Sequence, residues 1–405
     1  MFTRRAALIT GGLAGAGILA APAFLRAQSR PIRIGVLGDQ TSIGSAASGA
    51  GSILTAKMAV ADAGGTVLSR PIEVVSADFQ NKPDVAVSIA RRWFDEEGVS
   101  AITDMPISSA ALAVQSLATE KRRTMLISTS VSSDLTGKAC SPFASQWADD
   151  SYTLATSIVQ GLGRRTAEAK TWFLIVPDYA LGRAIARDAT QAITASGSTV
   201  LGTARHPVET TDFSSYLLQA QASGASMIGL GNVGENMINT VKQAQEFGLM
   251  RGKQSVALFL VYITDIHSLG LETAQGLNVV EGFYWNQSES SRAFGKRFIA
   301  ETGKMPSKAH AATYAAVAHF LKAVAASGTD EAAPVNARMR ETPVDFFGRN
   351  GRIREDGRVM FDLSLYRVKA PGQQSKPWDY YEQEQIIPQA IAYRPLDQGG
   401  CTIRS

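Results

Sequence analysis

Residues 32–63 read IRIGVLGDQTSIGSAASGAGSILTAKMAVADA. An apolar run comes first, a loop rich in glycine and serine follows, and a stretch with helical spacing of its apolar residues completes the segment. Short, continuous apolar strands next to helices are typical of parallel sheets that are covered on both faces. The segment therefore predicts a strand–loop–helix unit of an α/β fold, and its loop carries no catalytic residue.

The same alternation continues along the chain. Apolar runs predict strands at 32–37, 72–77, 100–103, 124–128, 171–176, 199–202, 226–230, 256–260 and 277–283. Helical spacing predicts helices at 51–63, 83–96, 109–120, 152–162, 181–195, 213–222, 234–247, 291–301, 309–326 and 334–342, followed by an extended stretch at 357–369. A polar passage at 141–150 separates two series of these units. We therefore expect two doubly wound parallel-sheet lobes, with a ligand cleft at the carboxyl ends of their strands.

The N-terminus has the features of an export signal. Thr3-Arg4-Arg5 precedes a glycine-broken apolar run at 6–21, and small residues stand near Ala27. This arrangement predicts a twin-arginine-type signal peptide over residues 1–27 and a mature protein that begins near Gln28 in the periplasm. A membrane anchor is the alternative, but the apolar run is shorter than the roughly 20 residues that a span needs.

The charge balance argues against several partners. The chain has 40 Lys+Arg and 36 Asp+Glu, and the leader holds three of the arginines and no acid, which leaves 37 against 36 in the mature chain. This near-neutral balance, without a basic run, argues against nucleic-acid binding. Nothing after the leader is apolar for long enough to insert into a membrane.

The chain contains only two cysteines, Cys140 and Cys401. In an oxidising compartment they predict one disulfide that ties the C-terminal tail to the middle of the chain. Two buried, unpaired thiols are the alternative, because the sequence does not give their distance. Two distant cysteines and four scattered histidines lack metal-ligand spacing, so no metal site is predicted.

One glycine motif has two possible interpretations, a dinucleotide-binding loop or a tight turn. Gly229-Leu-Gly231-Asn-Val-Gly234 matches the pattern of dinucleotide-binding loops between a strand and a helix. Its place in the second lobe, with no acid at the end of a following strand, favours a tight turn instead. Serine-hydrolase, zinc-protease and phosphate-loop motifs are missing from the sequence. We therefore predict no cofactor and no enzymatic activity.

Hydroxyl side chains cluster at two predicted strand-to-helix junctions. Ser108 and Ser109 follow the third strand, and the run 128–133 follows the fourth. Hydroxyls and free N–H groups at helix N-termini can bind a carboxylate without a buried cation. Ordinary N-capping is the alternative, although it explains one serine at each junction better than several.

These clusters belong to a longer set of segments. The set resembles the periplasmic solute-binding proteins of the branched-chain amino-acid ABC-transporter family, through 34–39, 57–62, 71–78, 128–136, 178–182 and 211–214. The resemblance covers essentially the whole mature chain. It implies the type I periplasmic-binding-protein fold, with two lobes joined by three crossover strands. We expect the first lobe at 28–149 and 283–357, the second at 150–282 and 358–390, and a C-terminal tail at 391–405.

The resemblance also implies binding residues on both lobes. Those of the first lobe, facing a carboxylate, are Ser108, Ser109, Ser130 and Ser132. Those of the second lobe are Tyr179, Asn232, Tyr262 and Asp265.

Two of these second-lobe positions depart from the family pattern. Asn232 stands where an aromatic ring is usual, and Asp265 is the nearest acid to the place where amino-acid-binding members carry a glutamate for the ligand's ammonium. A buried ammonium needs a counter-charge. If Asp265 only caps a helix at 266–271, a carboxylate with an uncharged or aromatic body, packed on Tyr179 and Tyr262, fits better than an amino acid.

The sequence thus predicts the periplasmic substrate-binding component of an ABC importer. It would capture a small aromatic or aliphatic acid, or a branched-chain amino acid, by lobe closure and deliver it as a monomer to an inner-membrane permease. A ligand-sensing regulator of the same fold is the first alternative, and an exported cofactor-dependent enzyme is the second.

Overall fold

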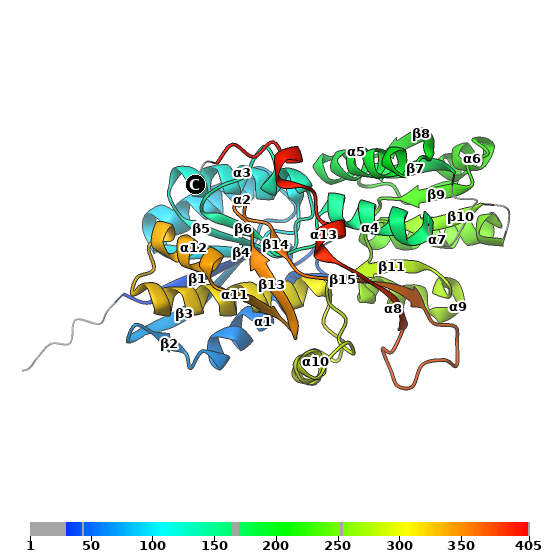
Figure 1. The fold of residues 1–405 in the computed structure, drawn as a ribbon. Helices are drawn as coiled ribbons and strands as arrows, with labels where there is room; N and C mark the ends of the chain where they lie inside the picture. Colours follow the sequence, from blue (N-terminus) through cyan, green and yellow to red (C-terminus); the bar gives the residue numbers. More distant parts are fainter. Residues whose placement is uncertain (1–29, 43, 164–169, 252–253, 404–405) are drawn as a thin grey trace, which may run out of the picture.

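The computed structural model describes residues 30–42, 44–163, 170–251 and 254–403 (Figure 1). The predicted leader at 1–27 lies outside these residues. Among the described helices, none combines the length and the apolar character that a membrane span requires.

Six strands form the first sheet, in the order β2-β3-β1-β4-β5-β6. They are β1 Ile32–Gly38, β2 Thr66–Val67, β3 Arg70–Asp78, β4 Val99–Asp104, β5 Thr124–Ile127 and β6 Ala144–Gln146. All neighbours pair in parallel except the short β2, which is antiparallel to β3. Ile34 and Leu37 of the central strand belong to different buried clusters, because the side chains of a strand point alternately to its two faces.

Helices cover both faces of this sheet (Figure 1). On one face α1 Gly49–Asp62 packs against α11 Lys308–Ser327, and on the other α2 Pro83–Arg92 packs against α3 Ser108–Glu120. The helix α12 Ala332–Glu341 packs on α11, and α10 Glu289–Thr302 contacts α1. We call this body lobe 1. Its helix α11 comes from a late part of the chain and contacts β4 and β5.

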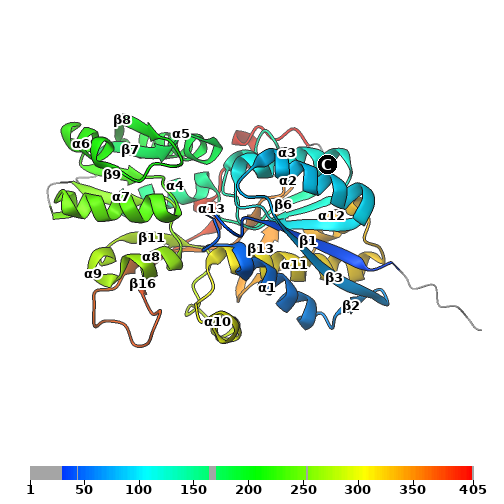
Figure 2. The same cartoon turned by 180° about the vertical axis from the view of Figure 1, so that it is seen from behind.

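A second body, which we call lobe 2, stands beside the first (Figures 1 and 2). Its parallel sheet has the order β10-β9-β7-β8, with β7 Thr171–Pro177, β8 Thr199–His206, β9 Met227–Leu230 and β10 Ser255–Leu258. Its helices are α4 Ser151–Gly163, α5 Ala180–Ala195, α6 Ser214–Ala222, α7 Gly234–Glu246, α8 Ile263–Leu269 and α9 Leu271–Ala274. The doubly wound α/β class that the sequence predicts is confirmed.

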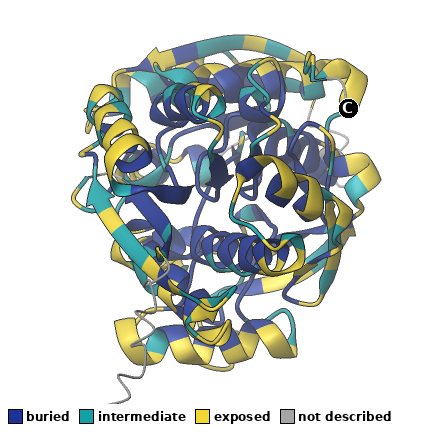
Figure 3. Ribbon diagram, turned by 90° about the vertical axis from the view of Figure 1, so that its left-hand side faces the viewer, coloured by how far each residue is buried: buried dark blue, intermediate teal, exposed yellow. Residues whose placement is uncertain are grey.

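Two small antiparallel sheets complete the fold. One has the order β11-β15-β16, with β11 Asn278–Glu281, β15 Leu363–Val368 and β16 Tyr381–Ile387. The other has the order β12-β13-β14, with β12 Val344–Phe346, β13 Arg349–Ile353 and β14 Val359–Met360. Buried residues line the interior between the outer helices, whose outward faces are exposed (Figure 3).

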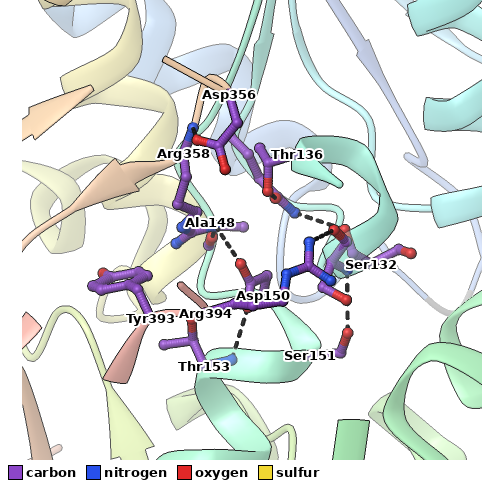
Figure 4. A network of polar contacts seen from close by, with 12 residues as sticks. Ser132, Thr136, Ala148, Asp150, Ser151, Thr153, Asp356, Arg358, Tyr393 and Arg394 are labelled. Atoms are coloured by element: carbon purple, nitrogen blue, oxygen red, sulfur yellow. Dashed lines mark hydrogen bonds and ion pairs between the residues drawn. The ribbon is translucent and has the colours of Figure 1, made fainter. Parts of the chain in front are cut away.

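Three segments of the chain connect the two bodies, after β6, after β11 and after β14. Asp149 of the first segment accepts a hydrogen bond from the Gly282 N–H of the second, at 3.1 Å from Oδ2. Arg358, the residue directly before β14 and the third segment, donates to the Ala148 carbonyl, and its Nη1 lies 3.5 Å from the Asp150 carboxylate (Figure 4). One buried polar network therefore holds all three connections together.

The C-terminal tail packs against this network. Cys140 and Cys401 form the disulfide that the sequence predicts, with Cα atoms 5.6 Å apart. Arg394 donates to the Ser133 carbonyl at 2.8 Å, and the ring of Tyr393 lies 5.0 Å from the Arg358 guanidinium (Figure 4). The disulfide and Arg394 thus fix the tail to lobe 1, and Tyr393 contacts Arg358 beside the third connection.

Some elements differ from the sequence prediction. The helix predicted at 83–96 is α-helical only to Arg92 and continues as a π-helical turn, Trp93–Glu97, whose first two residues are buried. The helix predicted at 266–271 begins earlier, at Ile263. The strands β2, β6, β12, β13 and β16 were not predicted. Most of them are two to five residues long, which leaves too few residues for a periodic pattern.

Candidate functional site

A narrow cavity of about 40 Å³ lies between the two lobes. Residues of lobe 1 that line it are Gly44, Ala46, Ala47, Pro106, Ile107, Thr129 and Val131. Residues of lobe 2 that line it are Tyr179, Leu181, Val233, Gly234, Leu260, Tyr262 and Asp265. The lining lies at the carboxyl ends of strands in both sheets, where ligands bind in doubly wound folds. Its small volume shows that the lobes are close together in this structure.

The lobe 1 wall is built from three loops that follow β1, β4 and β5. Asp39 holds the first loop, because its carboxylate accepts hydrogen bonds from Ser42 and from the Gly44 N–H at 2.9 Å. In the second loop, Pro106 and Ile107 lead directly into α3, whose first turn has no side-chain cap among the described residues. Uncapped N–H groups at a helix N-terminus favour an anion. This wall can therefore receive a carboxylate.

The predicted serines of lobe 1 do not line this wall. The hydroxyl of Ser130 donates to the Met105 carbonyl, and the hydroxyl of Ser132 accepts from the Asp134 N–H at 3.3 Å. The hydroxyl of Ser108 is buried without a hydrogen-bond partner among the described residues, and Ser109 lies partly exposed on α3 outside the lining.

Thr129 and Val131 line the cavity in place of Ser130 and Ser132. Successive side chains of an extended segment point to opposite sides. Thr129 and Val131 therefore face the cavity, and Ser130 and Ser132 face away from it. Thr129 donates its hydroxyl to the Asp104 carboxylate at 2.5 Å. The structure thus brings a hydroxyl to the cavity in the predicted run 128–133, but one position away from the predicted residues.

The lobe 2 wall contains both predicted tyrosines. Tyr179 precedes α5 and contacts both of the large buried clusters, while Tyr262 immediately precedes α8. Burial raises the pKa of each hydroxyl above its usual value, so both stay neutral. Asn232 is buried outside the lining and donates to the Thr240 hydroxyl at 2.7 Å, so its neighbour Val233 lines the cavity instead.

Asp265 caps a helix and also lines the cavity. Its Oδ2 accepts a hydrogen bond from the Tyr262 N–H at 2.9 Å and so caps α8, and the same side chain lines the cavity. Burial raises the pKa of Asp265 to about 6, although the Tyr262 N–H and the charge of Lys308 oppose the shift. At neutral pH the carboxylate is mostly ionised and offers a negative charge to the cavity.

A second, deeper chamber adjoins the cavity and shares Thr129, Val131 and Tyr262 with it. It contains Lys308, a buried cation that the sequence argument for a cation-free site missed. Lys308 Nζ donates to the Val280 carbonyl at 3.2 Å and lies 5.6 Å from the centre of the Tyr262 ring.

Two acids surround the Lys308 ammonium. Its Nζ is 3.3 Å from Glu281 and 3.8 Å from Asp149. Burial raises the pKa of Glu281 to about 8, against the opposing charge of Lys308, so Glu281 is mostly protonated at neutral pH. In the sequence, Lys308 appears only as a lysine at the start of an alanine-rich helix. A lysine at such a position is also common on a solvent-exposed surface, so the sequence does not mark Lys308 as buried.

The glycine motif has a packing role. A Cβ atom at Gly229 would lie 2.7 Å from the Phe259 ring, and one at Gly231 would lie 2.9 Å from Ile185. Gly234 begins α7 with a φ of +54°, which favours glycine. Among the described residues, no group of three or more His, Cys, Asp or Glu side chains is placed to hold a metal ion.

The two lobes, their three connections and the cavity between them form the architecture of a solute-binding protein. Residues 31–374 match the model of the family described as periplasmic binding protein, and the chain belongs to this family. No curated protein sequence matches the chain.

Two solved structures are 38% identical to the chain, and each alignment covers 92% of this chain and 99% of the other. One is a periplasmic binding protein of Burkholderia mallei, with a TM-score of 0.89. The other is a branched chain amino acid ABC transporter periplasmic ligand-binding protein of Burkholderia xenovorans LB400, with a TM-score of 0.83. A solute binding protein of an ABC transporter from R. palustris, in complex with benzoate, has the same fold at 16% identity, a TM-score of 0.80 and coverage of 92% and 100%.

Proposed function

We propose that this protein is the substrate-binding component of an ABC importer in the periplasm. It captures a small carboxylate-bearing solute between its lobes and delivers it to an inner-membrane permease. Residues 1–27 direct its export. Residues 28–149 and 283–357 form one closing unit, and residues 150–282 and 358–390 form the other.

The observation that carries this proposal is the composition of the interlobe cavity. An uncapped helix N-terminus and Thr129 stand on one side, and Asp265 stands on the other. The first side suits an anion and the second suits a cation. A solute that carries both charges is therefore better matched than one that carries a single charge.

We infer that the solute is an α-amino acid with an apolar side chain. Its carboxylate would face α3 and Thr129, its ammonium would face Asp265, and its side chain would pack on Tyr179 and Leu181. A plain carboxylic acid would bring no positive charge to Asp265, which would keep only its hydrogen bond from the Tyr262 N–H inside the cavity wall, and a buried charge without a counter-charge is unfavourable by several kcal/mol as an order of magnitude. The relative from B. xenovorans, described as a branched chain amino acid transporter protein, supports this class.

Contacts between the lobes support capture by closure. Arg187 on α5 of lobe 2 lies 2.8 Å from Asp134 of lobe 1, and the Ser133 hydroxyl donates to Asp188 at 2.6 Å. These contacts lie outside the cavity lining. They join the lobes without using the ligand, so they would add to the stability of the closed form that a permease recognises.

Isothermal titration calorimetry with a matched pair of solutes tests the proposal. L-leucine and 4-methylpentanoate share a carboxylate and a branched aliphatic body, and only leucine has the ammonium. We expect leucine to bind more tightly, and Asp265→Asn to remove most of that preference. Asp212→Asn, at an exposed position outside the cavity, is the control variant. Equal binding of the two solutes, or tighter binding of 4-methylpentanoate or benzoate, would show that the solute is a plain acid.

A further inference from the structure

Asp104 ends β4 directly behind the lobe 1 wall and is fully buried. Its φ is +82° and that of the next residue, Met105, is +64°. Residues other than glycine adopt such values rarely, and they cluster at functional sites where the surrounding structure holds them. This backbone directs the Asp104 carboxyl group toward the loop that follows β5.

Hydrogen bonds tie Asp104 to Thr129, which lines both chambers. The Thr129 hydroxyl donates to Asp104 Oδ1 at 2.5 Å, and the Thr129 N–H donates to the Asp104 carbonyl at 3.2 Å. The Asp104 N–H donates to the Ser128 hydroxyl at 3.1 Å. The carboxyl group of Asp104 is thus one hydrogen bond away from the ligand cavity.

The other carboxyl oxygen of Asp104 lacks a donor. Oδ2 is buried and accepts no hydrogen bond from the described residues. A Cβ atom at Gly38 would lie 2.6 Å from it, so the glycine leaves the space that this oxygen fills. An ionised carboxylate without donors is strongly disfavoured in a buried site.

The groups around Asp104 do not supply a compensating positive charge. From the end of β1 it faces Asp39, from α1 Ser52, and from β5 Ser128 and Thr129. Burial raises the pKa of Asp104 to about 7, the hydrogen bond from Thr129 opposes the shift, and the charge of Asp39 adds to it.

The nearest groups of α11 are also neutral. Thr313 shares a hydrogen bond with Ser128 at 2.7 Å, and His310 is bound to the Ser48 carbonyl at 2.9 Å. Burial lowers the pKa of His310 to about 4, so its ring carries no charge near neutral pH.

We propose that Asp104 is a positioning residue that couples solute capture to the uptake of one proton. When Asp104 is ionised, Thr129 donates its hydroxyl proton inward, and a negative charge stands one hydrogen bond behind the place of the ligand carboxylate. When Asp104 is protonated, it donates to the Thr129 oxygen, and the Thr129 hydroxyl proton turns toward the ligand carboxylate. The second state binds the solute. This inference depends on the proposed carboxylate site.

The direction in which the solute affinity changes with pH follows from these two protonation states of Asp104. Binding favours the protonated form, so the affinity falls as the pH rises through about 7, at most about tenfold for each pH unit. Asp265 acts in the opposite direction for an amino acid, because its protonation below about pH 6 removes the partner of the ammonium. Leucine affinity should therefore have an optimum between these values, whereas 4-methylpentanoate affinity should keep rising as the pH falls.

Calorimetric titration of both solutes from about pH 5 to about pH 9, in buffers of different ionisation enthalpy, measures the affinity and the proton uptake. We expect the wild type to take up close to one proton above the pKa of Asp104, and Asp104→Asn to bind without an alkaline decline. Thr129→Val should bind more weakly and also lose the decline, and Thr129→Ser should keep it. Glu281→Gln, which changes another buried acid, should keep it as well.

The outcomes distinguish failure of the proton-coupled inference from failure of the proposed function. Binding with no alkaline decline in the wild type, or a decline that persists in Asp104→Asn or Thr129→Val, overturns the proton-coupled inference and leaves the proposed function intact. If neither solute nor benzoate binds at any pH, the proposed function and the inference both fail.

Discussion

Lys308 Nζ, at the first residue of α11, lies 3.3 Å from Oε2 of Glu281, the last residue of β11. Both side chains are buried. The pair joins a lobe 1 helix to a strand beside lobe 2, next to the segments that connect the lobes, and Asp149 of one such segment is 3.8 Å from the same nitrogen. Lys308, Glu281 and Asp149 therefore form a buried polar cluster beside the connecting segments, and Lys308 and Asp149 line the chamber next to the interlobe cavity.

Removing Lys308 should destabilise the protein strongly. The Lys308→Met variant leaves the buried Asp149 carboxylate without its cation, and breaking a buried ion pair is unfavourable by about 3–5 kcal/mol. The double variant Lys308→Met with Asp149→Asn should recover part of the loss, because it also removes the buried carboxylate that Lys308→Met leaves without a cation. Urea unfolding measures both. A double variant less stable than Lys308→Met alone would contradict this account of the cluster.

Without ligand, the difference in stability between Asp104→Asn and the wild type should change with pH in a defined direction. Burial raises the pKa of Asp104 from 3.8 to about 7. The stability that its neutral form contributes is fully present below about pH 4 and is lost as the pH rises through about 7. The variant should therefore gain stability relative to the wild type over this range, up to about 4 kcal/mol. Denaturant melts at several pH values measure the difference, and a constant difference would show that Asp104 stays ionised in the folded protein.

The disulfide should stabilise the protein through its long loop. Cys140 and Cys401 are separated by 261 residues in sequence, and the loop-entropy model gives up to about 5 kcal/mol for a loop of this size. The double variant Cys140→Ala with Cys401→Ala should lower the midpoint of unfolding under non-reducing conditions. Reduction should lower the midpoint of the wild type in the same way and leave the double variant unchanged. An unchanged midpoint in both experiments would mean that the tail contributes little to folding.

Loss of the contact between the lobes should weaken solute binding slightly. Arg187→Gln removes the ion pair with Asp134, and a partly exposed pair is worth about 0.2–1 kcal/mol, or up to about fivefold in affinity. Arg183→Gln is the matched control, because Arg183 is on the same helix and pairs with Asp178 of its own lobe. Calorimetry measures both affinities. Equal effects of the two variants would indicate that the contact does not distinguish open from closed lobes.

Much of the fold could be predicted from the sequence. The long parallel strands are continuous apolar runs, so β1, β3, β4 and β7 were predicted to within about two residues of their observed ends. Of the antiparallel strands, β12, β13 and β16 were missed, and the first two are only three and five residues long. The strand predicted at 277–283 contains β11, and the extended stretch predicted at 357–369 contains β14 and β15. Whether Trp93 continues an α-helix or a π-helix depends on its burial, which a local pattern does not show.

The site was predicted in outline but not residue by residue. The loops after β4, β5, β7 and β10 do line the cavity, because strand ends of parallel sheets converge there. Within the run 128–133, a local pattern does not decide whether odd or even residues face the cavity, and in the structure Thr129 and Val131 line it. Lys308 is distant in sequence from every predicted site residue, and only the packing of α11 on the first sheet brings it near Tyr262.

A crystal structure of the protein with bound L-leucine tests the central claim most directly. The account predicts the solute inside the cavity between the lobes, with its carboxylate within hydrogen-bond distance of the Thr129 hydroxyl and its ammonium within hydrogen-bond distance of the Asp265 carboxylate. A solute bound outside this cavity, or bound inside it with the two ends reversed, would contradict the account.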